Sequence, residues 1–242
     1  MKDLLKAIDI RVSRRVYSEK PLSSEHIDLI NKEIEELNRV SGLSFSLHTN
    51  AFSMFDGFRK SYGLLKNVRN VVVLAGDATD SNLYEKLGYY GEILVLKLTL
   101  MGLGTCWVSG SFDKNDEIFK TLDTSLVVFG VITVGHIDKE LSFREKAIHN
   151  LSHIKTKKER DLYTAENPSE KFLEGIKALA KAPTANNSLN FHVLEKDGEI
   201  SMTVPKETSN NLCNLGIGKL HFEIGSDLGK FKFGSGGILD YK

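Results

Sequence analysis

The sequence predicts an α+β fold, because segments with helical and with strand periodicity both occur along its 242 residues. Residues 83–101 carry apolar side chains at helical spacing, whereas residues 70–75 and 125–137 are apolar runs rich in β-branched residues, typical of buried strands. The dipeptide Asp197-Gly198 separates two alternating segments and predicts a β-hairpin. A chain of this length can bury a hydrophobic core as one large domain or two small ones.

The composition is that of a soluble globular protein, with 41% hydrophobic and 26% charged residues. Lys plus Arg and Asp plus Glu number 32 each, so the chain has no general attraction to nucleic acid or anionic membranes. Its two cysteines, Cys106 and Cys213, cannot build a disulfide framework, and no Cys/His cluster indicates zinc. The N-terminus lacks the apolar core of a signal peptide. We therefore expect a cytoplasmic protein without a metal and without nucleic-acid or membrane partners.

The first long predicted helix begins after Pro21, where Ser23 or Ser24 can cap a segment with isoleucines at helical spacing. Residues 43–49 alternate like a half-buried strand. The buried strand at residues 70–75 follows, so this part of the chain predicts a helix and then two strands.

A long apolar helix is predicted at residues 81–101, with Asp80 or Ser81 as its cap. Its apolar stripe is so wide that partners must surround it on most sides. Gly102 stands where a helix commonly ends in a left-handed residue. A short helix near residues 115–122 then leads to the second buried strand.

Residues 139–160 are polar and basic. We interpret them as a solvated helix or linker, with residues 151–159 connecting two parts of the chain, because no aromatic residues interleave the charges as single-strand binders require. The second part begins at a helix start marked by Asn167 and Pro168 and continues into the hairpin. The basic run contains Lys155, Lys157, Lys158 and Arg160.

The two parts resemble each other around a Leu-Gly pair. Residues 81–104 are echoed by residues 209–229, with Leu87-Gly88 in the first and Leu215-Gly216 in the second. The second helix is expected to be shorter than the first and to cover residues 210–224. Chance similarity between two amphipathic helices is the alternative. We interpret the match as an internal duplication, with residues 1–150 as one half and residues 160–242 as a shortened second half.

Three short segments could carry chemistry, although each is weak alone. Arg11, Ser13 and Arg15 bring guanidinium groups and a hydroxyl that suit phosphate oxygens, and a surface patch is the alternative. Residues 182–188 form a turn-rich loop of small polar residues that could hold a flat polar ligand or merely connect two elements. Residues 102–110 leave the long helix through two glycines, without a GxGxxG or Walker pattern.

Together these segments resemble the nitroreductase family of flavoproteins and, within it, a single-chain branch. The family's R-x-S-x-R-x-[FY] segment, which binds the FMN phosphate, is similar to residues 11–17. Its P-S-x-x-N segment at the flavin is similar to the loop at residues 183–187, and its E-x-L-G helix and G-L-G-T-C-W stretch to residues 85–110. The matching residues are Arg11, Ser13, Arg15 and Tyr17 in the first segment and Pro183, Thr184, Ala185 and Asn187 in the second.

The resemblance implies an antiparallel core sheet flanked by helices and an FMN cofactor. It also implies that NADH or NADPH gives hydride to flavin N5, from which electrons pass to a nitroaromatic, a quinone or a similar small-molecule acceptor. By the same resemblance, Arg144 also reaches the phosphate, and the backbone of Ser109 and Gly110 lies near N5. No catalytic side chain is required, because the cofactor carries the electron transfer.

Two departures from the family pattern matter. Leu189, Asn190 and Phe191 replace the family's Gln-Pro-Trp, and the loop at Pro183 comes far later in the chain than in the family. Family members are intertwined homodimers in which the phosphate segment and the loop at one flavin come from different subunits. The duplication accounts for the shift if the first half keeps the phosphate segment and the second keeps the loop. One chain would then hold one flavin site and exist as a monomer or weak dimer.

Two other functions stay open. Reduced flavin could drive a different reaction, such as dehalogenation or flavin fragmentation. Alternatively, a halved site without the Gln-Pro-Trp could belong to a flavin-binding protein that does not turn over. The sequence identifies neither the physiological acceptor nor the choice between NADH and NADPH.

Overall fold

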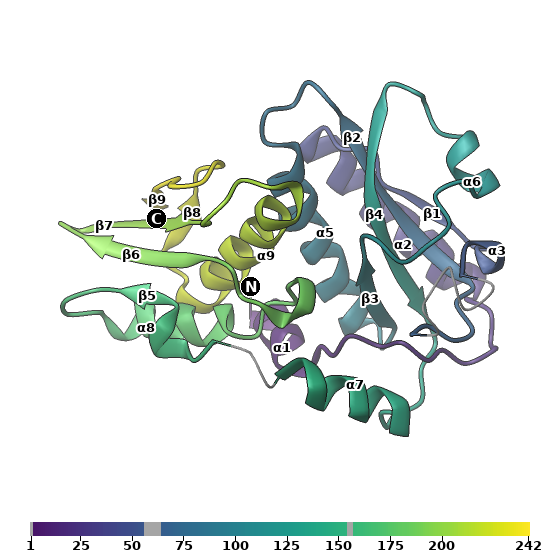
Figure 1. Cartoon of the computed structure of the whole chain (residues 1–242), viewed down its shortest axis with the longest axis horizontal. Coiled ribbons are helices and arrows are strands. Elements are labelled where there is room, and N and C mark those ends of the chain that lie inside the picture. The colour runs from purple at the N-terminus through teal and green to yellow at the C-terminus, as the bar shows by residue number, and fades with distance from the viewer. Residues whose placement is uncertain (1, 56–63, 154–156) are drawn as a thin grey trace. The chain divides into compact units, whose positions relative to one another are not determined.

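The computed structural model describes residues 2–55, 64–153 and 157–242 (Figure 1). The chain divides into two compact units. Unit 1 holds Met1–Arg11, Tyr84–Leu96 and Asn150–Lys242, and unit 2 holds Val12–Leu83 and Lys97–His149. Both units contain helices and strands, which confirms the predicted α+β class. The units are defined by compactness and cross the proposed halves, so the division at residues 150 and 160 remains a proposal about sequence duplication.

Unit 2 is built on a four-stranded antiparallel sheet with the strand order β1-β2-β4-β3. The two inner strands are the apolar runs recognised in the sequence, and the outer two are short. The antiparallel core sheet is thus confirmed. Its strands are β1 (Ser46–His48), β2 (Asn70–Asp77), β3 (Gly104–Val108) and β4 (Leu126–Gly135).

The first strand is shorter than the expected residues 43–49. The side chain of Asn38 accepts a hydrogen bond from the Phe45 N–H at 2.8 Å and donates one to the Phe45 carbonyl at 2.9 Å. The Ser44 N–H still donates to the Ala75 carbonyl at 2.9 Å, but the regular ladder with β2 covers only Ser46–His48.

Helix α2 (Ser24–Ser41) begins as predicted at Ser23, whose side chain accepts a hydrogen bond from the His26 N–H. It ends at Gly42, which has a left-handed φ of 74°. Its buried side chains are Ile30, Ile34, Leu37 and Ser41. The core of unit 2 contains Tyr17, Ala51, Met54, Phe55, Val68, Val71, Val73, Ala75, Val108, Phe112 and Val131.

Unit 1 combines helices with two small sheets. One sheet has the order β5-β6-β7 and the other pairs β8 with β9. The predicted hairpin is confirmed, because β6 and β7 pair antiparallel across Asp197 and Gly198, both of which have positive φ. The elements are α1 (Lys2–Ile10), β5 (Tyr163–Thr164), α8 (Glu170–Leu179), β6 (His192–Lys196), β7 (Glu199–Thr203), α9 (Ser209–Ser226), β8 (Gly229–Phe231) and β9 (Leu239–Tyr241).

Helix α5 (Leu83–Leu100) is the predicted apolar helix, and its residues from Tyr84 to Leu96 belong to unit 1. Its cap is not Asp80 or Ser81, as expected, but Asn82, whose side chain makes no capping bond. The Asp80 carboxylate instead accepts the Asn82 N–H at 2.9 Å, so it closes a turn one residue too early to cap the helix. Gly102 follows the helix with a φ of 77°, as predicted.

The second helix of the repeat is not shortened. Both α5 and α9 contain 18 residues, because α9 continues through His221 and Glu223 to Ser226. The expectation was wrong because the helix continues past Ile224 and ends only at Asp227, which has a left-handed φ of 50°. In unit 1, α9 packs against α5 at Gly88 and Gly216, as the repeat predicted.

The remaining elements are short or polar. The stretch interpreted as a solvated helix or linker contains α7, whereas residues 154–156, with Lys155, lie outside the described residues. Across the described ranges, none of the helices combines the length and the apolar character that a bilayer span requires. The elements are α3 (Phe52–Phe55), α6 (Glu117–Lys120), α7 (Phe143–His153), and the 3-10 turns η1 (Glu159–Asp161) and η2 (Ala185–Asn187).

Candidate functional site

The segment from Ser13 to Tyr17 lies against the edge of the unit 2 sheet. Ser13 forms a parallel bridge with Thr105 of β3, whose carbonyl accepts the Arg14 N–H at 2.8 Å. The buried Tyr17 hydroxyl donates to the Arg14 carbonyl at 2.9 Å and lies 2.6 Å from the Thr133 hydroxyl. Burial is the main reason why the pKa of Tyr17 is well above its ordinary value. Tyr17 therefore anchors the segment to the core as a neutral phenol.

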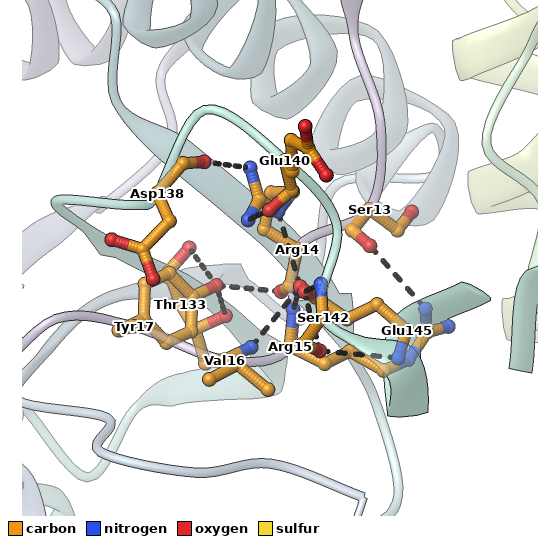
Figure 2. Close-up of polar contacts among 10 residues, drawn as sticks. All are labelled: Ser13, Arg14, Arg15, Val16, Tyr17, Thr133, Asp138, Glu140, Ser142 and Glu145. Atoms are coloured by element: carbon orange, nitrogen blue, oxygen red, sulfur yellow. Dashed lines mark hydrogen bonds and ion pairs between the residues drawn. The ribbon is translucent and has the colours of Figure 1, made fainter. Parts of the chain in front are cut away.

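Glu145, in the first turn of α7, binds this segment at three points (Figure 2). Its Oε1 accepts hydrogen bonds from Arg14 Nε at 3.1 Å, from the Arg15 N–H at 2.7 Å and from the Val16 N–H at 3.2 Å. Its Oε2 accepts the N–H and the hydroxyl of Ser142 at 2.9 and 2.8 Å. The start of α7 is thereby fixed to the segment.

The Arg14 guanidinium is fully engaged within the fold. Its two terminal nitrogens donate to the carbonyls of Asp138 at 2.9 Å and Glu140 at 3.2 Å, in addition to the bond with Glu145 (Figure 2). The residue is only 6% exposed. Of the neighbouring arginines 14 and 15, Arg14 thus has a structural role.

The contacts of Glu145 keep it ionised. Burial of the carboxyl raises its pKa, but the hydrogen bonds from Arg15, Arg14 and Ser142 outweigh burial and lower the pKa to about 2. An ionised carboxylate therefore contacts the segment from Ser13 to Tyr17. The sequence did not indicate this contact.

Arg15 and Arg144 have no carboxylate partners among the described residues. The Arg15 guanidinium donates to the Ser13 carbonyl at 3.3 Å, and within the described residues it forms no ion pair. Arg144 is exposed, neighbours Glu145 in the first turn of α7 and likewise forms no ion pair with a described residue. Guanidinium groups without carboxylate partners and a serine hydroxyl are the kinds of donor that suit a phosphate.

Ser109 and Gly110 follow β3 directly and are both exposed. Gly130 of β4 permits the close approach of the chain there, because a Cβ on it would lie 2.6 Å from the Val108 carbonyl oxygen and 3.1 Å from the Ser109 Cα. The structure thus brings Ser13, Arg15, Arg144, Ser109 and Gly110 into one unit. Gly130 was missed, because its contact depends on the pairing of β3 with β4.

Arg11 belongs to unit 1, at the end of α1. Its Nε lies 3.8 Å from Oε1 of the buried Glu92, and a terminal nitrogen donates to the Lys181 carbonyl at 3.4 Å. Glu92 also contacts His221 Nε2 at 2.9 Å, while the other ring nitrogen of His221 lies 3.0 Å from the Ala178 carbonyl. His221 is therefore a satisfied buried imidazole, and Arg11 has a structural contact that the sequence did not indicate.

The loop at residues 183–187 has a fixed and unusual backbone. Asn186, Asn187 and Leu189 have left-handed φ values of 54°, 53° and 44°. The Thr184 hydroxyl accepts the Leu189 N–H at 3.0 Å, and the Thr184 carbonyl accepts the Asn187 N–H at 2.9 Å. Pro183, Thr184 and Asn187 are half-buried and Ala185 is exposed, so the loop presents polar groups at a surface.

Asn214 of α9 holds this loop from within unit 1. Its Oδ1 accepts the Ala185 N–H at 3.3 Å, and the residue is 5% exposed. A polar amide within the apolar helix α9 was the one sequence signal that could have revealed this contact. Cys106 and Cys213 are both buried, and burial raises the pKa of the Cys213 thiol. Among the described residues, no group of His, Cys, Asp and Glu could hold a metal ion.

Comparison with known proteins identifies relatives of the chain. The family model described as "Putative TM nitroreductase" matches residues 3–226. A structure from Thermotoga maritima described as a putative nitroreductase is 16% identical, with a TM-score of 0.64 over 97% of this chain and 91% of that chain. This likeness shows a shared nitroreductase fold. No curated protein matches the chain.

Two further structures match a smaller share of the chain. One from Parabacteroides distasonis, described as a putative NADH dehydrogenase/NAD(P)H nitroreductase, is 24% identical, with a TM-score of 0.45 over 57% of this chain and 89% of that chain. One from Desulfovibrio desulfuricans, described as a putative nitroreductase in complex with FMN, is 19% identical, with a TM-score of 0.44 over 57% of this chain and 88% of that chain.

Proposed function

This chain belongs to the family described as "Putative TM nitroreductase", and from that premise we propose that it is an FMN-dependent oxidoreductase. The family supports a flavin oxidoreductase in general. Our proposal is that NADH or NADPH is the electron donor and that a nitroaromatic, a quinone or a similar small molecule is the acceptor.

The proposal rests on the different contacts that Arg14 and Arg15 make. Arg14 is buried, and each nitrogen of its guanidinium donates a hydrogen bond, one to Glu145 and two to backbone carbonyls. Arg15 is bound to Glu145 only through its backbone N–H, so its guanidinium is available to a ligand. Glu145 holds the backbone of this segment, while the Arg15 guanidinium has no carboxylate partner among the described residues. The segment is therefore preorganised for an anion such as a phosphate.

We assign the flavin contacts residue by residue. As the resemblance of residues 11–17 to the family segment implies, Arg11, Ser13, Arg15 and Arg144 would bind the FMN phosphate. The loop residues Pro183, Thr184, Ala185 and Asn187 would contact the flavin ring and ribityl chain, and the backbone of Ser109 and Gly110 would lie near N5. The bound flavin would supply hydride and electron transfer. The side chains of the site would bind and orient it, and none is needed as an acid or base.

We further propose that one chain carries one complete site and exists as a monomer or weak dimer. Residues 1–150 would supply the phosphate contacts and residues 160–242 the loop, with residues 151–159 as connector. The proposed duplication would replace the subunit contact of the dimeric family members by a contact within the chain.

Anaerobic reduction tests the function. The purified protein should be yellow, and NADH or NADPH should bleach the flavin absorbance. Addition of a nitroaromatic should restore the absorbance. Bleaching without reoxidation by any nitroaromatic or quinone would favour another reaction of reduced flavin, and flavin that neither donor bleaches would favour a binding protein without turnover. Protein that binds no FMN would overturn the proposal.

A further inference from the structure

The basic run that the proposed function leaves unused lines an open groove of unit 1. Lys157, Lys158 and Arg160 form one wall, and Lys177 of α8 adds a fourth cation. The cavity measures about 710 Å³, a size typical of small-molecule sites. Its other lining residues are Glu159, Tyr163, Leu173, Ile176 and Ala180.

The groove concentrates positive charge on a chain that is neutral overall. Glu159 is the one carboxylate among the lining residues, against four cations. Arg160 contacts Asp161 at 3.8 Å, but both side chains are exposed, so this ion pair neutralises little. Within the described residues, Lys157, Lys158 and Lys177 form no ion pair. An anionic ligand is therefore the complement of this groove.

The groove also offers an apolar surface. Leu173 and Ile176 lie on α8, Ala180 directly follows the helix, and Tyr163 lines the same groove. The Tyr163 ring packs edge-on against the buried Phe172 with ring centroids 5.5 Å apart, so it is held in position. Cations next to an apolar surface suit a ligand that combines phosphate groups with a flat ring.

The wall of the groove resembles the phosphate segment, and we interpret it as a diverged copy. Residues 157–163 read KKERDLY and residues 11–17 read RVSRRVY. Arg160 and Tyr163 match Arg14 and Tyr17, and a serine helix cap follows six positions after each tyrosine, at Ser23 and Ser169. Both segments also pair in parallel with another part of the chain, at Val16 with Lys66 and at Tyr163 itself with Val193.

The differences between the copies argue against a second FMN phosphate site. Glu159 and Asp161 stand at the positions of Ser13 and Arg15, so the hydroxyl and the free guanidinium are replaced by carboxylates. Arg160 is exposed, whereas its counterpart Arg14 is buried. The exposed arginine of this segment is thus Arg160, at a different position from Arg15 in the first segment. Lys158 and Lys177 add to the positive charge.

We propose that this groove is a second ligand site, which binds a nucleoside diphosphate. The phosphates lie against Lys157, Lys158, Arg160 and Lys177, and the base lies on the apolar surface beside Tyr163. The proposal concerns unit 1 by itself and does not require the flavin site.

The experiment is a titration of the full chain with ADP by calorimetry at low salt. Lys177→Glu and Arg160→Glu should each weaken ADP binding by about tenfold, because each replaces an attractive charge by a repulsive one. The matched control is Lys206→Glu, an exposed lysine of the same unit outside the groove, which should change the affinity less than twofold. Tyr163→Leu should weaken ADP binding and leave the weaker binding of pyrophosphate unchanged.

Three results would overturn the proposal: no heat of binding with ADP, equal affinity of ADP and pyrophosphate, or equal loss in the groove variants and in Lys206→Glu. Titration of each variant with FMN separates the two sites. FMN affinity should be the same in Lys177→Glu as in the parent. If the parent binds ADP but no FMN, the flavin assignment is wrong and the groove proposal is supported. If the parent binds FMN but no ADP, the groove proposal is wrong and the flavin assignment is supported.

Discussion

Gly88 of α5 and Gly216 of α9 occupy equivalent places in one helix crossing. A Cβ on Gly88 would lie 2.0 Å from the carbonyl oxygen of Cys213, and a Cβ on Gly216 would lie 2.0 Å from the carbonyl oxygen of Glu85. Each of these carbonyls belongs to the residue three positions before the opposite glycine, so the contact is reciprocal. A local twofold relation of this kind is what duplication of a Leu-Gly helix predicts.

Alanine at either glycine should therefore destabilise the protein. The clash is with backbone rather than with a flexible side chain, so the helices must separate, and we expect Gly88→Ala and Gly216→Ala each to cost more than about 2 kcal/mol. Urea unfolding followed by circular dichroism measures this. Leu100→Ala, at an exposed position of α5, is the control and should stay within about 0.5 kcal/mol of the parent. Two alanine variants as stable as that control would contradict the crossing.

Glu145→Gln should loosen the phosphate segment. A glutamine keeps the shape but turns one acceptor into a donor, which must then face the donors of Arg14, Arg15 or Ser142. The expected loss is about 3 kcal/mol, typical of breaking a buried ion pair. Glu140→Gln is the matched control, because its long contact with Lys146 is exposed, and it should have almost no effect.

The same carboxylate predicts a dependence on pH. The folded pKa of Glu145 is about 2, below its ordinary value of 4.5, so its stabilisation is complete above pH 4.5 and is lost as the pH falls toward 2. Unfolding curves across this range should show a decline that is about 2 kcal/mol larger in the parent than in Glu145→Gln. Parallel curves for the two proteins would show that Glu145 does not carry this stabilisation.

The sequence predicted the elements better than the contacts between them. Ser23 could be read as a cap because its partner His26 lies three residues away. By contrast, the choice of Arg14 as the buried arginine depends on Glu145 and on the carbonyls of Asp138 and Glu140, all more than 120 positions distant. No local pattern distinguishes Arg14 from Arg15, so the site residues could be proposed as a cluster but not ranked.

Glu223 predicts a dependence of stability on pH that is opposite to that of Glu145. Burial raises its pKa to about 7, although hydrogen bonds from the Tyr89 hydroxyl and the Phe231 N–H lower it. Because the folded state holds this proton more tightly than the unfolded state, stability falls as the pH rises from 4.5 to 7. Glu223→Gln can keep both contacts without a charge and should be about 2 kcal/mol more stable than the parent at pH 8. Urea unfolding at pH 5 and pH 8 checks this, with exposed Glu174→Gln as control. If Glu223→Gln changes the free energy of unfolding by the same amount at both pH values, the prediction is wrong.

The mass in solution tests the proposed single-chain site. If the contact between halves has become internal, light scattering should give the mass of one chain, 27.0 kDa, at micromolar concentration. Flavin should remain bound at one equivalent per chain on dilution. A dimer that loses flavin as it dissociates would show that the site is shared between chains.

The two ends of the flavin should respond to different variants. Arg15→Ala removes a charge-assisted contact to the phosphate worth roughly 1.5 to 3 kcal/mol, so FMN should bind about 10 to 100 times more weakly. Riboflavin lacks the phosphate, so its affinity should be unchanged and the preference for FMN should disappear. Asn187→Ala acts on the part that both ligands share and should weaken FMN and riboflavin by the same factor. Titration of apoprotein with each ligand separates these outcomes, with Arg39→Ala, an exposed arginine of α2, as the control for lost charge. If Arg15→Ala and Asn187→Ala both bind FMN as tightly as the parent, neither the Ser13 segment nor the loop at Pro183 holds the cofactor.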